Sequence, residues 1–133
     1  MKLVATLNSP LRVMLPRKNM PDKSWILNLN NYRNAPHFLL NDTKKLYKAA
    51  MEEQINQLPR MEKVAVRFTM FPGTRHKTDT PNVCSIHDKY FMDALVTAGK
   101  LEDDHSEFYV ETSYKPGHVD KDNPRVEIEI YEL

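Results

Sequence analysis

The sequence predicts an α+β fold in which a mixed β-sheet carries two helices packed on one face. Two segments repeat apolar residues at three- and four-residue steps, which is the pattern of an amphipathic helix. Three other segments alternate apolar and polar residues, as half-buried strands do. At 133 residues the chain has the length of one domain, so we expect a single domain over residues 1–133.

The composition is that of an ordinary soluble globular protein. Charged residues make up 28% of the chain, hydrophobic residues 41%, and the net charge is +1, which neither favours nor excludes a polyanionic partner. The single cysteine, Cys84, excludes an internal disulfide and a cysteine-rich zinc module. No apolar run approaches the roughly 20 residues of a bilayer span, and no signal-peptide core is present. We therefore expect a cytoplasmic protein with no membrane partner.

The N-terminal third is expected to be largely extended. Leu3–Thr6 and Leu11–Leu15 are short strand candidates on either side of the turn-forming Asn8-Ser9-Pro10, which suggests a hairpin or one bulged strand. The following segment, Pro16–Pro36, is rich in Asn, Lys, Arg and Pro. We interpret it as an extended segment that Trp25 anchors to the core.

A helix and a central strand follow. Asp42 is expected to cap a helix that ends at Pro59, because apolar residues recur on one face between them. Val64–Phe71 alternates with apolar character on both sides, which predicts a strand in the middle of the sheet. After the turn that ends this strand, three potentially cationic residues, Arg75-His76-Lys77, stand just before Asp79.

A second helix is predicted from Asn82 to Ala98, with Gly99 as its C-terminal stop. Cys84 and His87 are interpreted as packing residues of this helix, since neither has a zinc-like partner or a nearby general base.

Two strands are predicted near the C-terminus, Phe108–Tyr114 and Val126–Tyr131, joined by the polar loop Lys115–Pro124. Each alternates between one buried and one solvated face, which favours an antiparallel pair over the helices.

One stretch of the chain resembles a known family. The run from Asp79 to Asp104 reads D-x-x-N-V-x-S-I-x-D-K-x-x-x-D-A-L-V-x-A-G-x-L-x-D-D, and the chain ends with K-D-N-P-R-V-E-I-E-I. Together they resemble the RusA family of Holliday junction resolvases in its phage-encoded form. The similarity extends from about residue 60 to residue 133 and is looser before that. Asn30-Asn31-Tyr32-Arg33 is similar to an N-x-Y-R segment that forms a basic loop toward DNA in RusA-type proteins.

The resemblance implies a structure-specific endodeoxyribonuclease that resolves branched DNA in recombination and repair. It implies a twofold dimer, a phage or prophage origin, and Mg²⁺ (with Mn²⁺ as a substitute) as the cofactor of phosphodiester hydrolysis. The metal ligands it implies are Asp79, Asp103 and Asp104, and Lys89 completes the catalytic set. Our candidates for DNA contact are Arg33, Arg75, Lys77, Lys89 and Lys115.

Pro81 departs from the family pattern, because it stands where the RusA motif has its second Asp. Proline offers no oxygen to a metal, which leaves three alternatives. Asp88 or Glu102 replaces the missing ligand, or Mg²⁺ binds weakly through the remaining carboxylates and water, or cleavage is lost and the fold binds DNA or a protein partner without cutting. All but the last alternative require that the acidic residues at both ends of the second helix converge beside Lys89.

Overall fold

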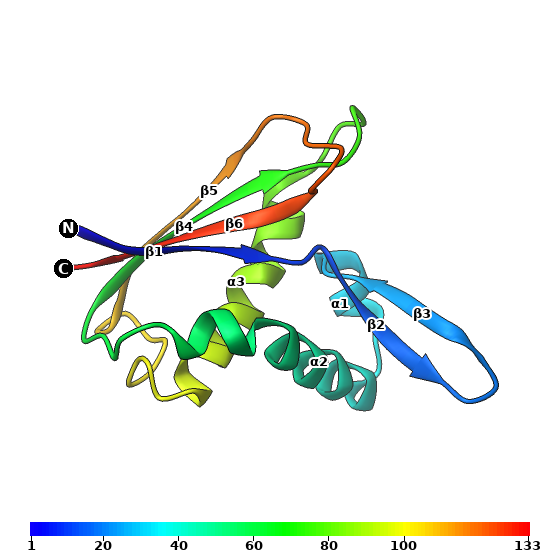
Figure 1. The fold of residues 1–133 in the computed structure, drawn as a ribbon, viewed down its shortest axis with the longest axis horizontal. Coiled ribbons are helices and arrows are strands. Elements are labelled where there is room, and N and C mark those ends of the chain that lie inside the picture. Colours follow the sequence, from blue (N-terminus) through cyan, green and yellow to red (C-terminus); the bar gives the residue numbers. More distant parts are fainter.

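The fold is α+β, as predicted, and the computed structural model describes all 133 residues (Figure 1). A four-stranded mixed sheet has the order β1-β6-β4-β5, and β2 and β3 form a separate two-stranded ribbon. The strands are β1 (Lys2–Ser9), β2 (Arg12–Arg17), β3 (Met20–Ile26), β4 (Val64–Phe71), β5 (Tyr109–Pro116) and β6 (Arg125–Glu132). The helices are α1 (Leu29–Asn34), α2 (His37–Asn56) and α3 (Thr80–Thr97), one more than expected.

Strand β4 lies in the middle of the sheet, as its two-sided apolar pattern predicted. It pairs antiparallel with β6 and parallel with β5. Val64, Val66 and Phe68 are fully or almost fully buried, and Ala65 and Thr69 on the opposite face are buried as well. The sheet therefore presents its apolar face to α2 and α3, and β5 forms one of its two edges.

The predicted antiparallel pairing of the last two strands is wrong. β4 separates β5 from β6, and β5 runs parallel to β4. The reason lies in the connection between them: β4, α3 and β5 follow one another as strand, helix and strand, and such a crossover joins parallel strands.

The predicted N-terminal hairpin is also wrong. β1 pairs with β6 at the other edge of the sheet, and β2 pairs with β3. The chain leaves the sheet at Pro10, a residue with no N–H for a ladder hydrogen bond. Trp25 anchors this region as expected: it is 6% exposed, and its ring stacks on Tyr90 with the centroids 6.1 Å apart.

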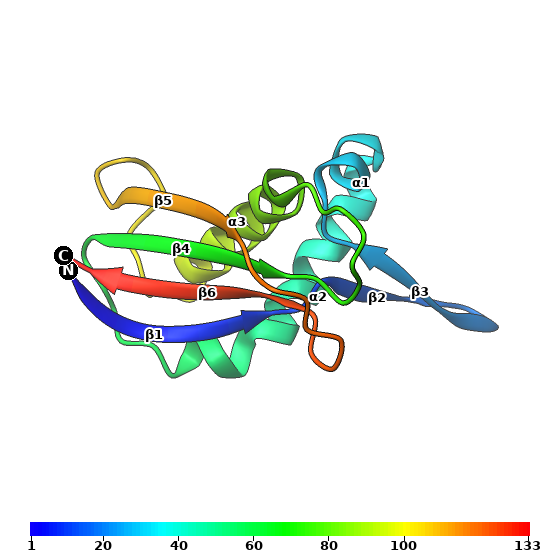
Figure 2. The same ribbon diagram turned by 90° about the horizontal axis from the view of Figure 1, so that it is seen from above.

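The ribbon formed by β2 and β3 projects from the body, away from the end where the two termini lie (Figures 1 and 2). Lys18 and Asn19 form its two-residue turn, and Asn19 has a left-handed φ of 60°, which asparagine tolerates better than most residues.

Helix α2 begins at His37, five residues before the predicted cap at Asp42. The extra turn was not visible in the apolar pattern, because its first buried residue is Thr43 and Phe38 is 70% exposed. Helix α3 agrees closely with the prediction, and Gly99 follows it with a positive φ of 76°. None of the three helices combines the length and apolar character of a membrane span.

A buried polar network joins β1, α2 and α3 in the core. The Ser9 hydroxyl lies 2.6 Å from the Tyr47 hydroxyl and 2.6 Å from Nδ1 of His87. Ser9, Tyr47 and His87 are all completely buried, and Nε2 of His87 has no hydrogen-bond partner. His87 is therefore a core residue, as the sequence indicated.

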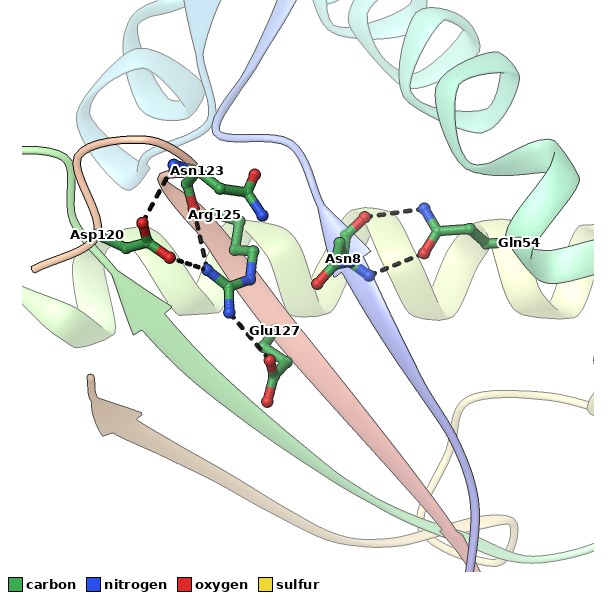
Figure 3. A network of polar contacts seen from close by, with 6 residues as sticks. All are labelled: Asn8, Gln54, Asp120, Asn123, Arg125 and Glu127. Atoms are coloured by element: carbon green, nitrogen blue, oxygen red, sulfur yellow. Dashed lines mark hydrogen bonds and ion pairs between the residues drawn. The ribbon is translucent and has the colours of Figure 1, made fainter. Parts of the chain in front are cut away.

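The same end of β1 is also held from the surface (Figure 3). The Gln54 amide accepts a hydrogen bond from the Asn8 N–H at 2.8 Å and donates one to the Asn8 carbonyl at 2.9 Å, as a neighbouring strand would. Nearby, Arg125 donates to Asp120 and Glu127 and lies over the Phe71 ring at 4.3 Å. These contacts fix the point where the chain passes from the sheet into the ribbon.

Candidate functional site

Asp79 is the N-cap of α3. Its Oδ1 accepts a hydrogen bond from the Asn82 N–H at 3.3 Å, and the residue is exposed. Pro81 lies in the first turn of the helix, where a missing N–H leaves no intrahelical bond unmade and the fixed φ favours helix formation. The residue that replaces the motif aspartate therefore has a structural use in starting α3.

Asn82 connects α3 to α1. Its side-chain oxygen accepts a hydrogen bond from the Leu29 N–H at 2.9 Å, which satisfies a backbone donor in the first turn of α1. Asn28 caps the same helix by accepting from the Asn31 N–H. The segment expected to be a basic loop is thus a short helix packed on α3, and Arg33 is exposed in its last turn.

Lys89 is exposed on α3 beside α1. Its ammonium lies 5.9 Å from the centroid of the Tyr32 ring, within the range of a cation–π contact. It forms no ion pair with a carboxylate, whereas Asp93, one turn further along the helix, is paired with Lys48 at 3.1 Å. The Lys89 charge therefore remains free to meet an anion.

Asp88 is half-buried between α3 and β5, where two tyrosines hold its carboxylate. Tyr109 donates to Oδ1 at 3.0 Å and Tyr114 donates to Oδ2 at 2.6 Å. Burial raises the pKa of Asp88, and the charge of Asp104 raises it further, while the two hydrogen bonds and the charge of Lys89 act in the opposite direction. Asp88, Lys89 and Asp104 are thus close enough to influence one another.

An irregularity in β5 brings both tyrosines to one side. The pairing with β4 shifts after Tyr109, which is opposite Val64, so that the next residue of β4 is opposite Glu111. Val110 is the extra residue of this bulge. Without it, Tyr109 and Tyr114 would point to opposite faces, because they are an odd number of residues apart.

The acidic cluster after α3 is only partly available for a metal. The Glu102 carboxylate accepts from Arg60 at 2.8 Å. The Asp103 carboxylate accepts from the Asp104 N–H at 2.7 Å and lies 4.0 Å from His105. Asp104 is exposed, and its side chain forms neither a hydrogen bond nor an ion pair. Of the two replacement ligands considered above, Asp88 faces Asp104 and Glu102 faces Arg60.

The expected convergence of Asp79 with Asp103 and Asp104 beside Lys89 does not occur within one chain. Asp79 precedes α3 and the aspartate pair follows it, and an 18-residue helix is about 27 Å long. Figures 1 and 2 show the loops that carry them at opposite ends of the helix. No three His, Cys, Asp or Glu side chains lie together in a way that could hold a metal ion.

Two of the predicted DNA contacts lie at the Asp79 end of α3, in one of two loops packed together. Arg75 and Lys77 are exposed in the loop after β4. This loop lies against the loop after β5 through the bonds Gly117 N–H to Met70 O and Asp120 N–H to Pro72 O. Lys115 is exposed at the end of β5 beside them. Basic side chains thus surround a shallow groove between the two loops.

The sequence did not indicate that Tyr109 and Tyr114 belong to the site. Asp88 was visible in the motif, but its two hydrogen-bond donors depend on the bulge at Val110, and no residue type marks that bulge. A comparison of the chain with protein-family models and with curated proteins found no match.

Proposed function

We propose that the protein is a RusA-like endodeoxyribonuclease that cuts branched DNA with Mg²⁺ as cofactor. The observation that carries the proposal is the group formed by Asp88, Asp104 and Lys89, two carboxylates and an unpaired ammonium near one another on α3. It supports the resemblance drawn from the sequence and assigns the missing ligand to Asp88.

The donor set suits Mg²⁺. This ion prefers hard oxygen ligands and is usually bound by one or two carboxylates together with waters and substrate phosphate oxygens. When bound, it would supply an activated water and neutralise charge on the scissile phosphate. Asp88 and Asp104 would hold the ion, Tyr109 and Tyr114 would keep Asp88 oriented, and Lys89 would stabilise the developing charge on a phosphate oxygen.

A twofold dimer through the exposed edge of β5 would complete the site. If two β5 strands pair antiparallel about Ser113, Glu111 of each protomer faces Lys115 of the other, so both cross-strand pairs join opposite charges. Thr78 and Thr80, on either side of Asp79, lie near Pro116 at one end of β5, and Tyr109 at its other end donates its N–H to the His105 carbonyl. The pairing would therefore bring Asp79 of one protomer toward Asp104 of its partner, and Lys115 would meet the partner instead of DNA.

Charge reversal tests this dimer. Glu111→Lys and Lys115→Glu each place like charges opposite one another and should shift the protein toward monomer in analytical ultracentrifugation. The double variant should restore the dimer. A dimer unaffected by either single change would exclude this edge as the interface and would leave Lys115 as a candidate for DNA contact.

Cleavage of a labelled four-way junction tests the nuclease. With Mg²⁺ or Mn²⁺ we expect paired symmetric nicks, which Asp88→Asn and Asp104→Asn should reduce at least about 100-fold, the scale expected when second-shell support or a ligand is lost. Asp93→Asn is the matched control, since it removes a carboxylate from the same helix at a surface ion pair with Lys48. Equal loss in all three variants would contradict the assignment.

The second candidate is a RusA-fold protein that binds branched DNA or a protein partner without cutting. Pro81 favours it, because a motif carboxylate is absent. A junction that is retarded in a gel but never nicked would support it. Pro81→Asp should fold, since an acidic residue is favourable in the first turn of a helix. If cleavage rises, the site was one ligand short. If cleavage is absent from both proteins, the non-cutting function is the correct one.

A further inference from the structure

The ribbon of β2 and β3 is unusual because its outer half contributes nothing to the core. All eight residues from Pro16 to Lys23 are exposed, and both views show the ribbon extending beyond the helices (Figures 1 and 2). Holding eight residues in a fixed strand pair with no burial in return costs conformational entropy. A binding role would account for a projection of this kind.

The ribbon tip is basic. Arg17, Lys18 and Lys23 give the exposed segment three positive charges against one negative charge from Asp22, although the whole chain has a net charge of only +1. The side chains of Lys18 and Lys23 form no ion pair or hydrogen bond, so both are free to meet phosphates. Met20 at the tip is 57% exposed and adds an apolar contact.

The ribbon is joined to the candidate site. Its base is fixed by the bond from the Asn31 side chain to the Ile26 carbonyl and by that from the Leu27 N–H to the Leu11 carbonyl. Asn31 belongs to α1, which also carries Arg33 and packs Tyr32 near Lys89. A basic path therefore runs from the candidate site over α1 to the ribbon.

We propose that the β2–β3 ribbon is a DNA-binding arm that lies in the major groove of a duplex arm next to the branch point. The major groove, about 12 Å wide, admits a two-stranded ribbon, whereas the minor groove, about 6 Å wide, does not without distortion. Arg17, Lys18 and Lys23 contact phosphates on the two sides of the groove. The identity of the partner as branched DNA rests on the proposed function, and the arm itself rests on the shape and charge of the ribbon.

Salt-dependent DNA binding tests the arm. The variant Lys18→Ala/Lys23→Ala removes two charges whose side chains have no bonding partner. The control Lys2→Ala/Lys63→Ala removes two exposed charges near the termini, at the opposite end of the molecule. Fluorescence anisotropy is measured in EDTA with a labelled four-way junction. We expect the slope of log K against log salt to fall by about 1.8 in the arm variant, or about 0.9 per phosphate contact, and to stay unchanged in the control.

A tethered cleavage reagent gives the position of the arm. Cys84 is buried, so Met20→Cys provides the one accessible thiol for an iron chelate. Hydroxyl-radical cuts should fall within one duplex arm, with the strand offset that marks the major groove. Cuts spread evenly along the DNA, or the offset of the minor groove, would overturn the placement.

The outcomes separate this inference from the proposed function. If the arm and control variants bind with the same slope as the wild type, the arm is wrong and the nuclease proposal stands. If binding depends on the arm but no junction is ever cut, the arm stands and the nuclease proposal fails. If the wild type binds no DNA but binds phosphatidylserine vesicles through Lys18 and Lys23, the arm contacts a lipid surface and the DNA inference is overturned.

Discussion

Two consecutive residues of α3, His87 and Asp88, show how differently one helix can treat ionisable groups. His87 is completely buried and bonded only to the neutral Ser9–Tyr47 pair. Asp88 is half-buried, receives two tyrosine hydroxyls and lies near the charges of Lys89 and Asp104. The first environment keeps a group neutral and serves stability, whereas the second surrounds a carboxylate with charges that a ligand can alter.

The two environments give opposite pH dependence. Burial lowers the pKa of His87 from 6.5 to about 3, so between these values the unfolded chain binds a proton that the folded chain does not. Stability is lost there as the pH falls. The pKa of Asp88 is raised, so its contribution is present below the ordinary value of 3.8 and is lost as the pH rises through the folded-state pKa.

The largest effect we expect is acid destabilisation through His87. Each pH unit between about 6.5 and the folded pKa removes about 1.4 kcal/mol, so roughly 3 kcal/mol should be lost from pH 6.5 to pH 4. Urea unfolding of the wild type and of His87→Gln across this range measures it. The difference between the two free energies should change with pH, and parallel curves would show that His87 is not buried neutral.

A smaller effect should follow from removing the hydroxyl at the centre of the buried network. Ser9→Ala leaves the Tyr47 hydroxyl and Nδ1 of His87 without partners in the core, which should lower the free energy of unfolding by about 2–3 kcal/mol. Tyr114→Phe removes the 2.6 Å bond to the more accessible Asp88 and should lower it by about 1 kcal/mol. Equal losses at pH 7 would remove the distinction between the two environments.

The smallest effect on stability is expected for Asp88→Asn. The amide oxygen still accepts a tyrosine hydrogen bond, and a partly buried charge is removed, so stability at pH 7 should be unchanged or higher by up to about 1 kcal/mol. Thermal unfolding beside the junction-cleavage assay gives both readouts. A variant that is inactive but no less stable would identify Asp88 as a functional group, and a clear loss of stability would make it structural.

The sequence predicted the regular elements better than their pairing. Periodicity located β4 and α3 closely, because both are buried over most of their length. It did not reveal that β1 pairs with β6 or that β5 lies parallel to β4, since partners far apart in the chain leave no local signal. The early start of α2 was missed because its first turns are exposed.

The candidate site divides in the same way. Lys89, Asp88 and Asp104 could be named from the motif, and Asp79 could be recognised as a helix-entry residue. Their separation could not, because the loop after α3 does not return to the start of the helix. The tyrosines that hold Asp88 depend on a one-residue shift in strand pairing, which only the folded backbone reveals.

The junction between β1 and β2 has a mechanical consequence. Asn8 and Ser9 are fastened at the root of the ribbon, one from the surface by Gln54 and one from the interior by Tyr47 and His87 (Figure 3). A lever needs such a fulcrum, and a pull on the far tip would be transmitted to the middle of α3 instead of being absorbed in a loose joint.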